Sequence, residues 1–521
     1  MGEDRNASEL SESLVRETVT LDNAQGPGAT LTQKATVGVA WTGLFQISRQ
    51  LLSLLSISVL ARHISPSAYG LIAMATVLTN FLDTVRDLGT TSALVREPNL
   101  SDRLLSTMFW FNCLLGLLLT LCVVGLSFPA ALFFHEPALA KILQALSITF
   151  VITATSVVPN ALLTRRMAFR EIAITQFAGA VTGTGVAIGI ALNGGGVWSL
   201  VFASLASTTM TAVAFWVFGR RRYQWVLDWK ESRSIRSFSL GLSGFNVLNY
   251  FSRNADNLIV GRFLGKDPLG FYNMAYTLMT YPLSNFSAVI CQVLFPALAK
   301  VQDDNQRFRS AYCRTCALIG LATFPAMLGV TVVADPLVRV VLGERWLPVA
   351  GLLRVFGPLG MAQSVFTTTG LIYQAKGRAD WLLRWGLVSA TVYVASFFLG
   401  LPWGIQGVAI SYSIAWTILM VPGFLIPFRL IELPAREFAL QLWPGLKASL
   451  IMALVAAAWL MGLERMGVHG ATIQLFSTAA IGALSYLAIL WWRQPPAVGE
   501  LRTLLLQSGN GIAMRVASWL T

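Results

Sequence analysis

Fourteen apolar stretches, each long enough to cross a lipid bilayer as a helix, account for most of this chain of 521 residues. A helix needs about 20 apolar residues to span the hydrocarbon core of a membrane. The stretches are centred near residues 50, 79, 116, 149, 181, 207, 247, 280, 321, 360, 390, 415, 450 and 481. They lack the strict alternation of membrane β-strands. The sequence therefore predicts an all-α polytopic membrane protein with about 14 transmembrane helices.

Charge is scarce and unevenly placed. Only 12% of the residues are charged, against about a quarter in soluble proteins, which excludes a soluble enzyme. The net charge of +13 would suggest nucleic-acid binding in a soluble domain. Here, loops after even-numbered stretches hold 20 Lys and Arg, whereas loops after odd-numbered stretches hold 7. By the positive-inside rule this bias places both termini in the cytoplasm and explains the charge without nucleic acid.

The loops predict a protein that is not an enzyme. The longest outward loop, about residues 334–347, offers only Asp335 and Glu344 as carboxylates. A membrane glycosyltransferase or polymerase would need a larger catalytic loop. The chain contains no GxxxxGK[ST] phosphate-binding loop. Cys313 and Cys316 form a CxxC pair with no second pair beside it, so we expect no metal site.

An internal repeat with an offset of 200 residues organises the chain. Residues 61–78 align with 261–278 without a gap, and 5 of 18 positions are identical, including Gly70 with Gly270. The repeat predicts two parallel lobes related by an axis along the membrane normal. The predicted segments are a disordered cytoplasmic tail (1–36), an N-lobe (37–219), a basic cytoplasmic loop (220–236), a C-lobe (237–427), two further spans (428–492) and an amphipathic cytoplasmic tail (493–521).

Polar and ionisable side chains recur inside the spans. An ionisable group facing lipid at mid-membrane costs about 2.5–3.5 kcal/mol on insertion scales, so these residues are expected to face a water-filled cavity between the lobes. A purely structural pair of Arg253 and Asp256, which locks two helices, is the alternative. The residues lie in spans 1, 2, 7, 8 and 10 and are Gln46, Arg49, Asn80, Asp83, Arg86, Asn246, Asn249, Arg253, Asp256, Asn273 and Arg354.

Several motifs resemble those of bacterial polysaccharide flippases of the Wzx type. Leu60-Ala61-Arg62, followed by Ser65-Pro66 and Tyr69-Gly70, is similar to the first signature of that family. Asn254-Ala255-Asp256-Asn257, followed by Gly261-Arg262, is similar to the second-half signature. The resemblance covers about residues 36–492. Within the MOP superfamily, the chain resembles most the polysaccharide transporter branch, which includes the colanic acid exporter.

The resemblance implies a V-shaped fold of two lobes and a monomer in the bacterial inner membrane. The implied substrate is an undecaprenyl-pyrophosphate-linked oligosaccharide repeat unit, moved from the cytoplasmic to the periplasmic leaflet for exopolysaccharide or lipopolysaccharide synthesis. Alternating access coupled to H+ or Na+ is also implied, with no other cofactor. Other polysaccharide-assembly proteins are plausible partners. A multidrug exporter of the MATE type and a flippase for a lipid II-type peptidoglycan precursor remain the alternatives.

Chemistry divides the polar residues into three predicted roles. Arginine offers bidentate donors to a diphosphate, so Arg49 and Arg253 are the first candidates, followed by Arg86 and Arg354. The sugars are expected to meet the amides of Gln46, Asn80, Asn246, Asn249 and Asn273. Asp83 and Asp256 are the candidates for ion coupling. Arg62 and Arg262, at equivalent outward ends, are expected to anchor in the membrane interface, and steering of the lipid headgroup is the alternative.

Overall fold

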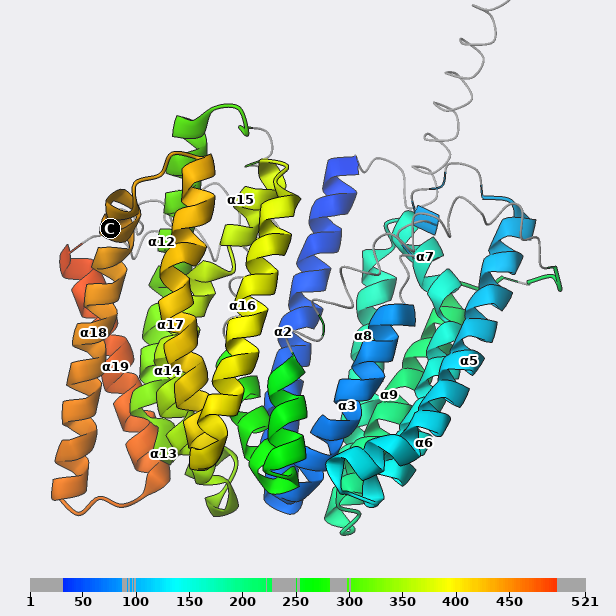
Figure 1. Cartoon of the computed structure of the whole chain (residues 1–521), viewed down its shortest axis with the longest axis horizontal. Helices are drawn as coiled ribbons and strands as arrows, with labels where there is room; N and C mark the ends of the chain where they lie inside the picture. The colour runs from blue at the N-terminus through cyan, green and yellow to red at the C-terminus, as the bar shows by residue number, and fades with distance from the viewer. Residues whose placement is uncertain are drawn as a thin grey trace, which may run out of the picture. The chain divides into compact units, whose positions relative to one another are not determined.

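The fold was analysed in a computed structural model, which describes residues 31–86, 91, 94–95, 97, 100–221, 223–226, 250, 254–281, 298 and 301–493. Side chains at 31–44, 46–47, 85, 379 and 493 fall outside this description. The described part of the chain consists of helices and turns, without a strand (Figure 1). An all-α fold is therefore confirmed.

The first half of the chain contributes seven helices to the described structure. They are α2 (Leu31–His63), α3 (Pro66–Arg86), α5 (Asp102–Phe134), α6 (Ala138–Ala154), α7 (Val157–Arg165), α8 (Phe169–Leu192) and α9 (Val197–Phe218). Helices α8 and α9 are joined by a tight turn in which Gly194 and Gly196 have φ angles of 76° and 52°. Glycine adopts such angles without strain, which explains why the chain turns here between the spans predicted near residues 181 and 207.

The second half begins with helical residues 254–263 and 266–281. The later helices are α12 (Asn305–Val332), α13 (Ala334–Val341), α14 (Pro348–Phe366), α15 (Thr369–Ala375), α16 (Ala379–Gly400), α17 (Gly404–Leu430), α18 (Ala435–Arg465) and α19 (Ala471–Arg493). Short 3-10 turns cover Glu344–Trp346 and Leu401–Trp403.

Eight helical segments of the described structure are long and apolar enough to cross a membrane. A ninth results if α6 and α7, which are bent by 42° at their junction, form one broken span. Every predicted span centre except the one near residue 247, which lies outside the described residues, falls within a helix. The protein is therefore a multi-pass membrane protein, and the total of 14 spans stays a prediction.

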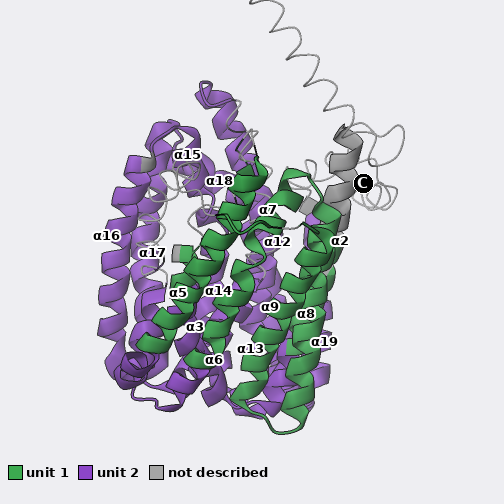
Figure 2. Ribbon diagram, turned by 90° about the vertical axis from the view of Figure 1, so that its right-hand side faces the viewer, with its two compact units in different colours: residues 1–56, 82–126, 143–246 green, residues 57–81, 127–142, 247–521 purple. Residues whose placement is uncertain are grey.

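The chain divides into two compact units (Figure 2). The first contains residues 1–56, 82–126 and 143–246, and the second contains 57–81, 127–142 and 247–521. Parts of α2, α3, α5 and α6 thus group with the second half of the sequence. The units cut across single helices, so the lobe boundaries expected at 219 and 237 stay a prediction.

In the first unit, the beginning of the predicted inter-lobe loop packs against the start of α5. Trp110 Nε1 donates a hydrogen bond to the Gln224 carbonyl over 3.0 Å, and the Gln224 N–H donates to Ser106 Oγ over 3.1 Å. Trp225 stacks on Trp110 with ring centroids 3.7 Å apart, although 84% of its surface is exposed. This part of the loop is therefore fixed to the first unit, whereas Trp229 lies outside the described residues.

The segment expected to be an outward loop, residues 334–347, is ordered as α13 and a 3-10 turn. This correction has a physical reason in Trp346, whose side chain is fully buried and whose Nε1 donates to the Ala61 carbonyl over 2.8 Å. Its indole also meets the Tyr69 ring edge-on at 5.2 Å. Because a buried indole needs both apolar contacts and a hydrogen-bond acceptor, this side chain determines the path of the segment.

We expect Trp346→Leu to destabilise the second unit strongly. The substitution leaves a cavity and removes the donor for the Ala61 carbonyl, so its expected cost is about 3 kcal/mol. Thermal unfolding of the purified full-length protein in detergent measures the effect as a lower melting temperature. Trp403→Leu is the matched control, since Trp403 is 74% exposed. Equal melting temperatures for the two variants would contradict the anchoring role of Trp346.

Candidate functional site

Arg62 and Arg262, which are equivalent in the 200-residue repeat, make equivalent contacts within the second unit. Arg62 Nη2 donates to the Val340 carbonyl over 2.6 Å, in the connection that follows span 9. Arg262 Nη1 donates to a ring nitrogen of His135, in the connection that follows span 3, and its guanidinium lies over the Phe133 ring. Arg62 of the first repeat thus contacts a connecting segment of the second repeat, and Arg262 of the second repeat contacts one of the first. These contacts lie within the protein, so the role of both arginines as anchors in the membrane interface stays a prediction.

The helices that follow these arginines cross at extremely close range. A Cβ atom on Gly70 would lie 1.8 Å from the Lys266 carbonyl oxygen, and one on Gly270 would lie 2.1 Å from the Pro66 carbonyl oxygen. Lys266 and Pro66 are themselves equivalent under the offset of 200, so the contact is reciprocal. Glycine at both positions lets the two backbones touch. The repeat found in the sequence therefore corresponds to a symmetric packing contact.

Asp256 is the charged side chain that is buried within the described part of the chain, with 8% of its surface exposed. It lies in helical residues 254–263, and its Oδ1 accepts a hydrogen bond from the Asn257 N–H over 2.8 Å. Its Oδ2 accepts from the Tyr272 hydroxyl over 3.2 Å. Beside it, Asn257 Oδ1 is buried and has no hydrogen-bond partner among the described residues. A carboxylate in such surroundings is poorly compensated while it is ionised.

Tyr272 contacts this carboxylate directly, and further contacts extend from it to tyrosines of two other helices. We define the Asp256 cluster as Asp256, Tyr272, Tyr276, Gln363, Tyr393 and Tyr412. Tyr272 and Tyr276 lie one turn apart with nearly parallel rings, 6.4 Å between centroids. Tyr412 on α17 accepts from Gln363 Nε2 on α14 over 3.3 Å, and its ring lies 5.4 Å from that of Tyr393 on α16. Tyr412 lies close enough to Asp256 for the carboxylate to act electrostatically on its hydroxyl.

Sequence reasoning identified Asp256 but missed most of its neighbours. Tyr276 lies on the polar stripe of span 8, and its spacing of four residues from Tyr272 is a usable signal. Gln363, Tyr393 and Tyr412 stand singly in three apolar helices. Nothing in the local pattern indicates that they meet, because only tertiary packing brings them together.

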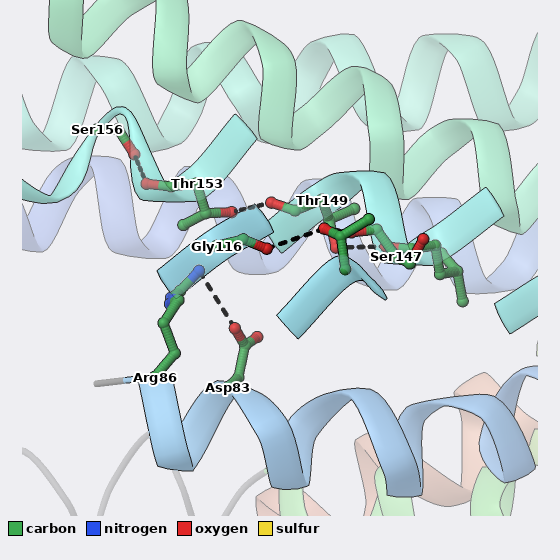
Figure 3. A network of polar contacts seen from close by, with 9 residues as sticks. Asp83, Arg86, Gly116, Ser147, Thr149, Thr153 and Ser156 are labelled. Atoms are coloured by element: carbon green, nitrogen blue, oxygen red, sulfur yellow. Dashed lines mark hydrogen bonds and ion pairs between the residues drawn. The ribbon is translucent and has the colours of Figure 1, made fainter. Parts of the chain in front are cut away.

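In the first unit, predicted site residues pair with close neighbours. Arg49 Nη1 on α2 donates to Gln176 Oε1 on α8 over 3.1 Å. Asp83 and Arg86, one turn apart on α3, form an ion pair at 3.2 Å (Figure 3). The Arg86 side chain is 15% exposed and that of Asp83 is 49% exposed. The cationic group of Arg86 is therefore partly neutralised by a carboxylate that was expected to act separately.

Figure 3 also shows how hydroxyl groups on α5, on α6 and at the start of α7 are satisfied by helix carbonyls. Thr153 Oγ1 donates to the Thr149 carbonyl over 2.7 Å, and Ser156 Oγ donates to the Thr153 carbonyl over 2.8 Å. Thr120 Oγ1 reaches from α5 to the Ser147 carbonyl on α6 over 2.9 Å. Such bonds to helix carbonyls let polar side chains remain inside a membrane span.

The remaining predicted site residues are dispersed. In the second unit, Arg354 on α14 forms an ion pair with Asp335 of α13, Asn273 is half-buried and Asn80 is exposed. Asn246, Asn249, Arg253 and the Gln46 side chain lie outside the described residues. The pairing of Arg253 with Asp256 and the shared cavity therefore stay predictions. The geometry supports two separate polar centres, the Asp256 cluster and the Arg49–Gln176 pair.

Repeated membrane-spanning helices, reciprocal contacts between repeats and charged groups within spans together describe a polytopic membrane transporter. A family model for polysaccharide biosynthesis proteins matches residues 59–351, more than half of the chain. The chain belongs to this family, and with it to the Wzx-type polysaccharide transporters of the MOP superfamily. The predicted family is thereby confirmed.

Curated relatives and a solved structure agree with this placement. The lipopolysaccharide biosynthesis protein WzxC of Escherichia coli is 24% identical over 92% of this chain and 98% of its own length. The succinoglycan biosynthesis transport protein ExoT of Rhizobium meliloti is 25% identical over 87% of this chain and 92% of its own. The structure of the lipid II flippase MurJ in an inward closed conformation matches with a TM-score of 0.70 and 17% identity, over 87% of this chain and 99% of that one. ExoT is named as a transport protein and MurJ as a flippase, which supports the prediction that this protein is not an enzyme.

Proposed function

We propose that this protein moves a lipid-linked oligosaccharide repeat unit from the cytoplasmic to the periplasmic leaflet of a bacterial inner membrane, with both termini in the cytoplasm. Membership of a polysaccharide biosynthesis family of transporters supports the substrate class. The substrate carries a diphosphate between the lipid and the sugars. That charge needs a cationic partner during its passage through the membrane.

The observation that carries the proposal is an arginine of α2, at the first predicted span, whose guanidinium is hydrogen-bonded to a side chain of a second helix. Arg49 Nη1 donates a hydrogen bond to the side-chain amide oxygen of Gln176 on α8, which orients the guanidinium. Arg86 and Arg354 form ion pairs with Asp83 and Asp335 respectively. Arg49 is the first candidate for binding the diphosphate, because a side chain of a second helix positions its guanidinium, which offers bidentate donors to phosphate. Asp256 supplies the ion-coupling group in this proposal.

We expect Arg49→Gln to reduce transport about tenfold or more, because a charge-assisted hydrogen bond to phosphate contributes about 1.5–3 kcal/mol. Arg49→Lys should retain part of the activity, since an ammonium binds phosphate as a point charge without the bidentate geometry. The measurement is the amount of lipid-linked repeat unit on the cytoplasmic leaflet of deletion cells that carry each variant.

Arg436→Gln is the matched control, because Arg436 is exposed at the start of α18. Melting temperatures of the purified variants verify that each protein folds. Normal clearance of the lipid by Arg49→Gln would remove Arg49 from the substrate path. A deletion strain that accumulates no lipid-linked saccharide would instead refute the transport proposal itself, and a soluble exported substrate would then be sought.

A further inference from the structure

An open groove lies between α6 and α9 in the first unit, and none of its lining residues was predicted to bind the transported substrate. Its volume is about 470 Å³. Val151 and Ile152 line it from α6, while Val213, Trp216 and Val217 line it from α9. Val213 and Val217 are each 51% exposed, so the groove opens onto the surface of two apolar helices.

The groove is almost entirely apolar. Its two threonine hydroxyls are already bonded to their own helices. Thr155 Oγ1 donates to the Ile152 carbonyl over 2.7 Å, and Thr209 Oγ1 donates to the Leu205 carbonyl over 2.7 Å. Neither hydroxyl needs a polar ligand in the groove. A hydrocarbon chain is therefore the occupant that matches these walls.

One cationic group stands at the end of the groove. Arg220 lines it, lies two residues after the end of α9 and is exposed. The adjacent Arg221 is occupied by an ion pair with Asp102 of α5. Arg220 makes no hydrogen bond or ion pair with the rest of the described structure. The groove thus combines apolar walls with a positive charge at the end that the loop charges predict to be cytoplasmic.

We infer that the groove between α6 and α9 binds an anionic glycerophospholipid of the cytoplasmic leaflet, with one acyl chain along α9 and the phosphate at Arg220. From Thr209 to Val217 the groove follows about 12 Å of α9, and Arg220 lies three residues further along the chain. This length approaches half of the hydrocarbon core of roughly 30 Å, which is the depth of one leaflet. A polyprenyl chain would extend well beyond a site of this length.

A lipid in this groove would also contact Trp216, which packs against aromatic side chains at the start of the inter-lobe loop. The Trp216 ring, which lines the groove, meets the Phe109 and Tyr223 rings edge-on at 5.6 and 5.7 Å. Tyr223 stacks on Phe109 at 4.3 Å, and burial raises the pKa of Tyr223 to about 12, so its ring stays uncharged at neutral pH. Trp216 therefore contacts the start of the loop on one side and would contact the acyl chain on the other.

Native mass spectrometry of the full-length protein in detergent tests this inference. The delipidated protein is titrated with phosphatidylglycerol and, separately, with phosphatidylethanolamine. We expect one phosphatidylglycerol to bind most tightly, and Arg220→Gln to weaken it about fivefold, the contribution of one basic residue near a membrane surface. Val213→Trp, which fills the groove, should abolish that binding step.

Two matched variants serve as controls. Arg103→Gln removes an exposed arginine from the first turn of α5, and Val388→Trp adds an indole to a half-exposed position on α16. Both should bind phosphatidylglycerol as the unaltered protein does. Equal weakening by Arg220→Gln and Arg103→Gln overturns the inference, as does equal affinity for the two lipids. Polyprenyl phosphate displacing phosphatidylglycerol from the groove would also overturn it.

Discussion

Alanine at Gly70 or Gly270 is expected to separate the two repeats where their backbones meet. The added methyl group would lie about 2 Å from a carbonyl oxygen of the opposite helix, 1.8 Å at Gly70 and 2.1 Å at Gly270. Side-chain rotation cannot relieve a clash with backbone, so the helices must move apart. The expected cost is about 3 kcal/mol, the upper part of the usual range for overpacking. Thermal unfolding of the purified protein should show a clearly lower melting temperature for either variant.

Gly125→Ala and Gly189→Ala provide matched controls within α5 and α8. A Cβ at either control position meets nothing within 4 Å. Alanine also has a higher helix propensity than glycine, so these variants should melt at or slightly above the original temperature. A small shift at Gly70 with no difference from the controls would contradict the close crossing.

The double variant tests whether the contact is truly reciprocal. Once Gly70→Ala has forced the helices apart, the second substitution finds the space already open. The cost of Gly70→Ala together with Gly270→Ala should therefore be well below the sum of the two single costs, as for residues that share one contact. Additive costs would show that the two glycines occupy independent contacts. The double-mutant cycle thus measures the interaction free energy between Gly70 and Gly270.

The apolar stretches and the alignment at an offset of 200 were sufficient to predict the helices and the repeat. An apolar run of about 20 residues has few alternatives to a membrane helix, because backbone polar groups must be satisfied within the segment. The offset of 200 between Gly70 and Gly270 correctly indicated equivalent positions. Their mutual contact was not evident, since a repeat establishes equivalence without showing which equivalent surfaces touch.

Sequence reasoning missed contacts between distant segments and also one local pair. Residues 334–347 were expected to be a loop between two spans, whereas they form α13 and a 3-10 turn, and Trp346 has buried partners on α2 and α3. Asp83 and Arg86 were assigned different roles, although their spacing of three residues favours the ion pair that forms. The tyrosines around Asp256 come from separate helices, so no single stretch of sequence contains their pattern.

Asp256→Asn is expected to reduce transport about tenfold, within the usual range of coupling free energies, and to remove its dependence on the coupling ion. Asparagine keeps the size of the side chain and an oxygen that can accept from the Tyr272 hydroxyl, so the fold should survive. It cannot gain or lose a proton, and it carries no charge to hold a cation. Transport into proteoliposomes, measured with an imposed proton gradient and then with a sodium gradient, separates these effects.

Two variants distinguish ion coupling by Asp256 from a merely structural role. Tyr272→Phe removes the hydroxyl bonded to Oδ2 but keeps the carboxylate, so transport should continue with its ion dependence altered rather than lost. Asp267→Asn removes an exposed carboxylate nearby and should change neither property. A stable Asp256→Asn protein that transports at the normal rate under both gradients would show that the buried carboxylate only packs the helices. Loss of the response to just one gradient would identify the coupling ion, because the carboxylate is then required for that ion alone.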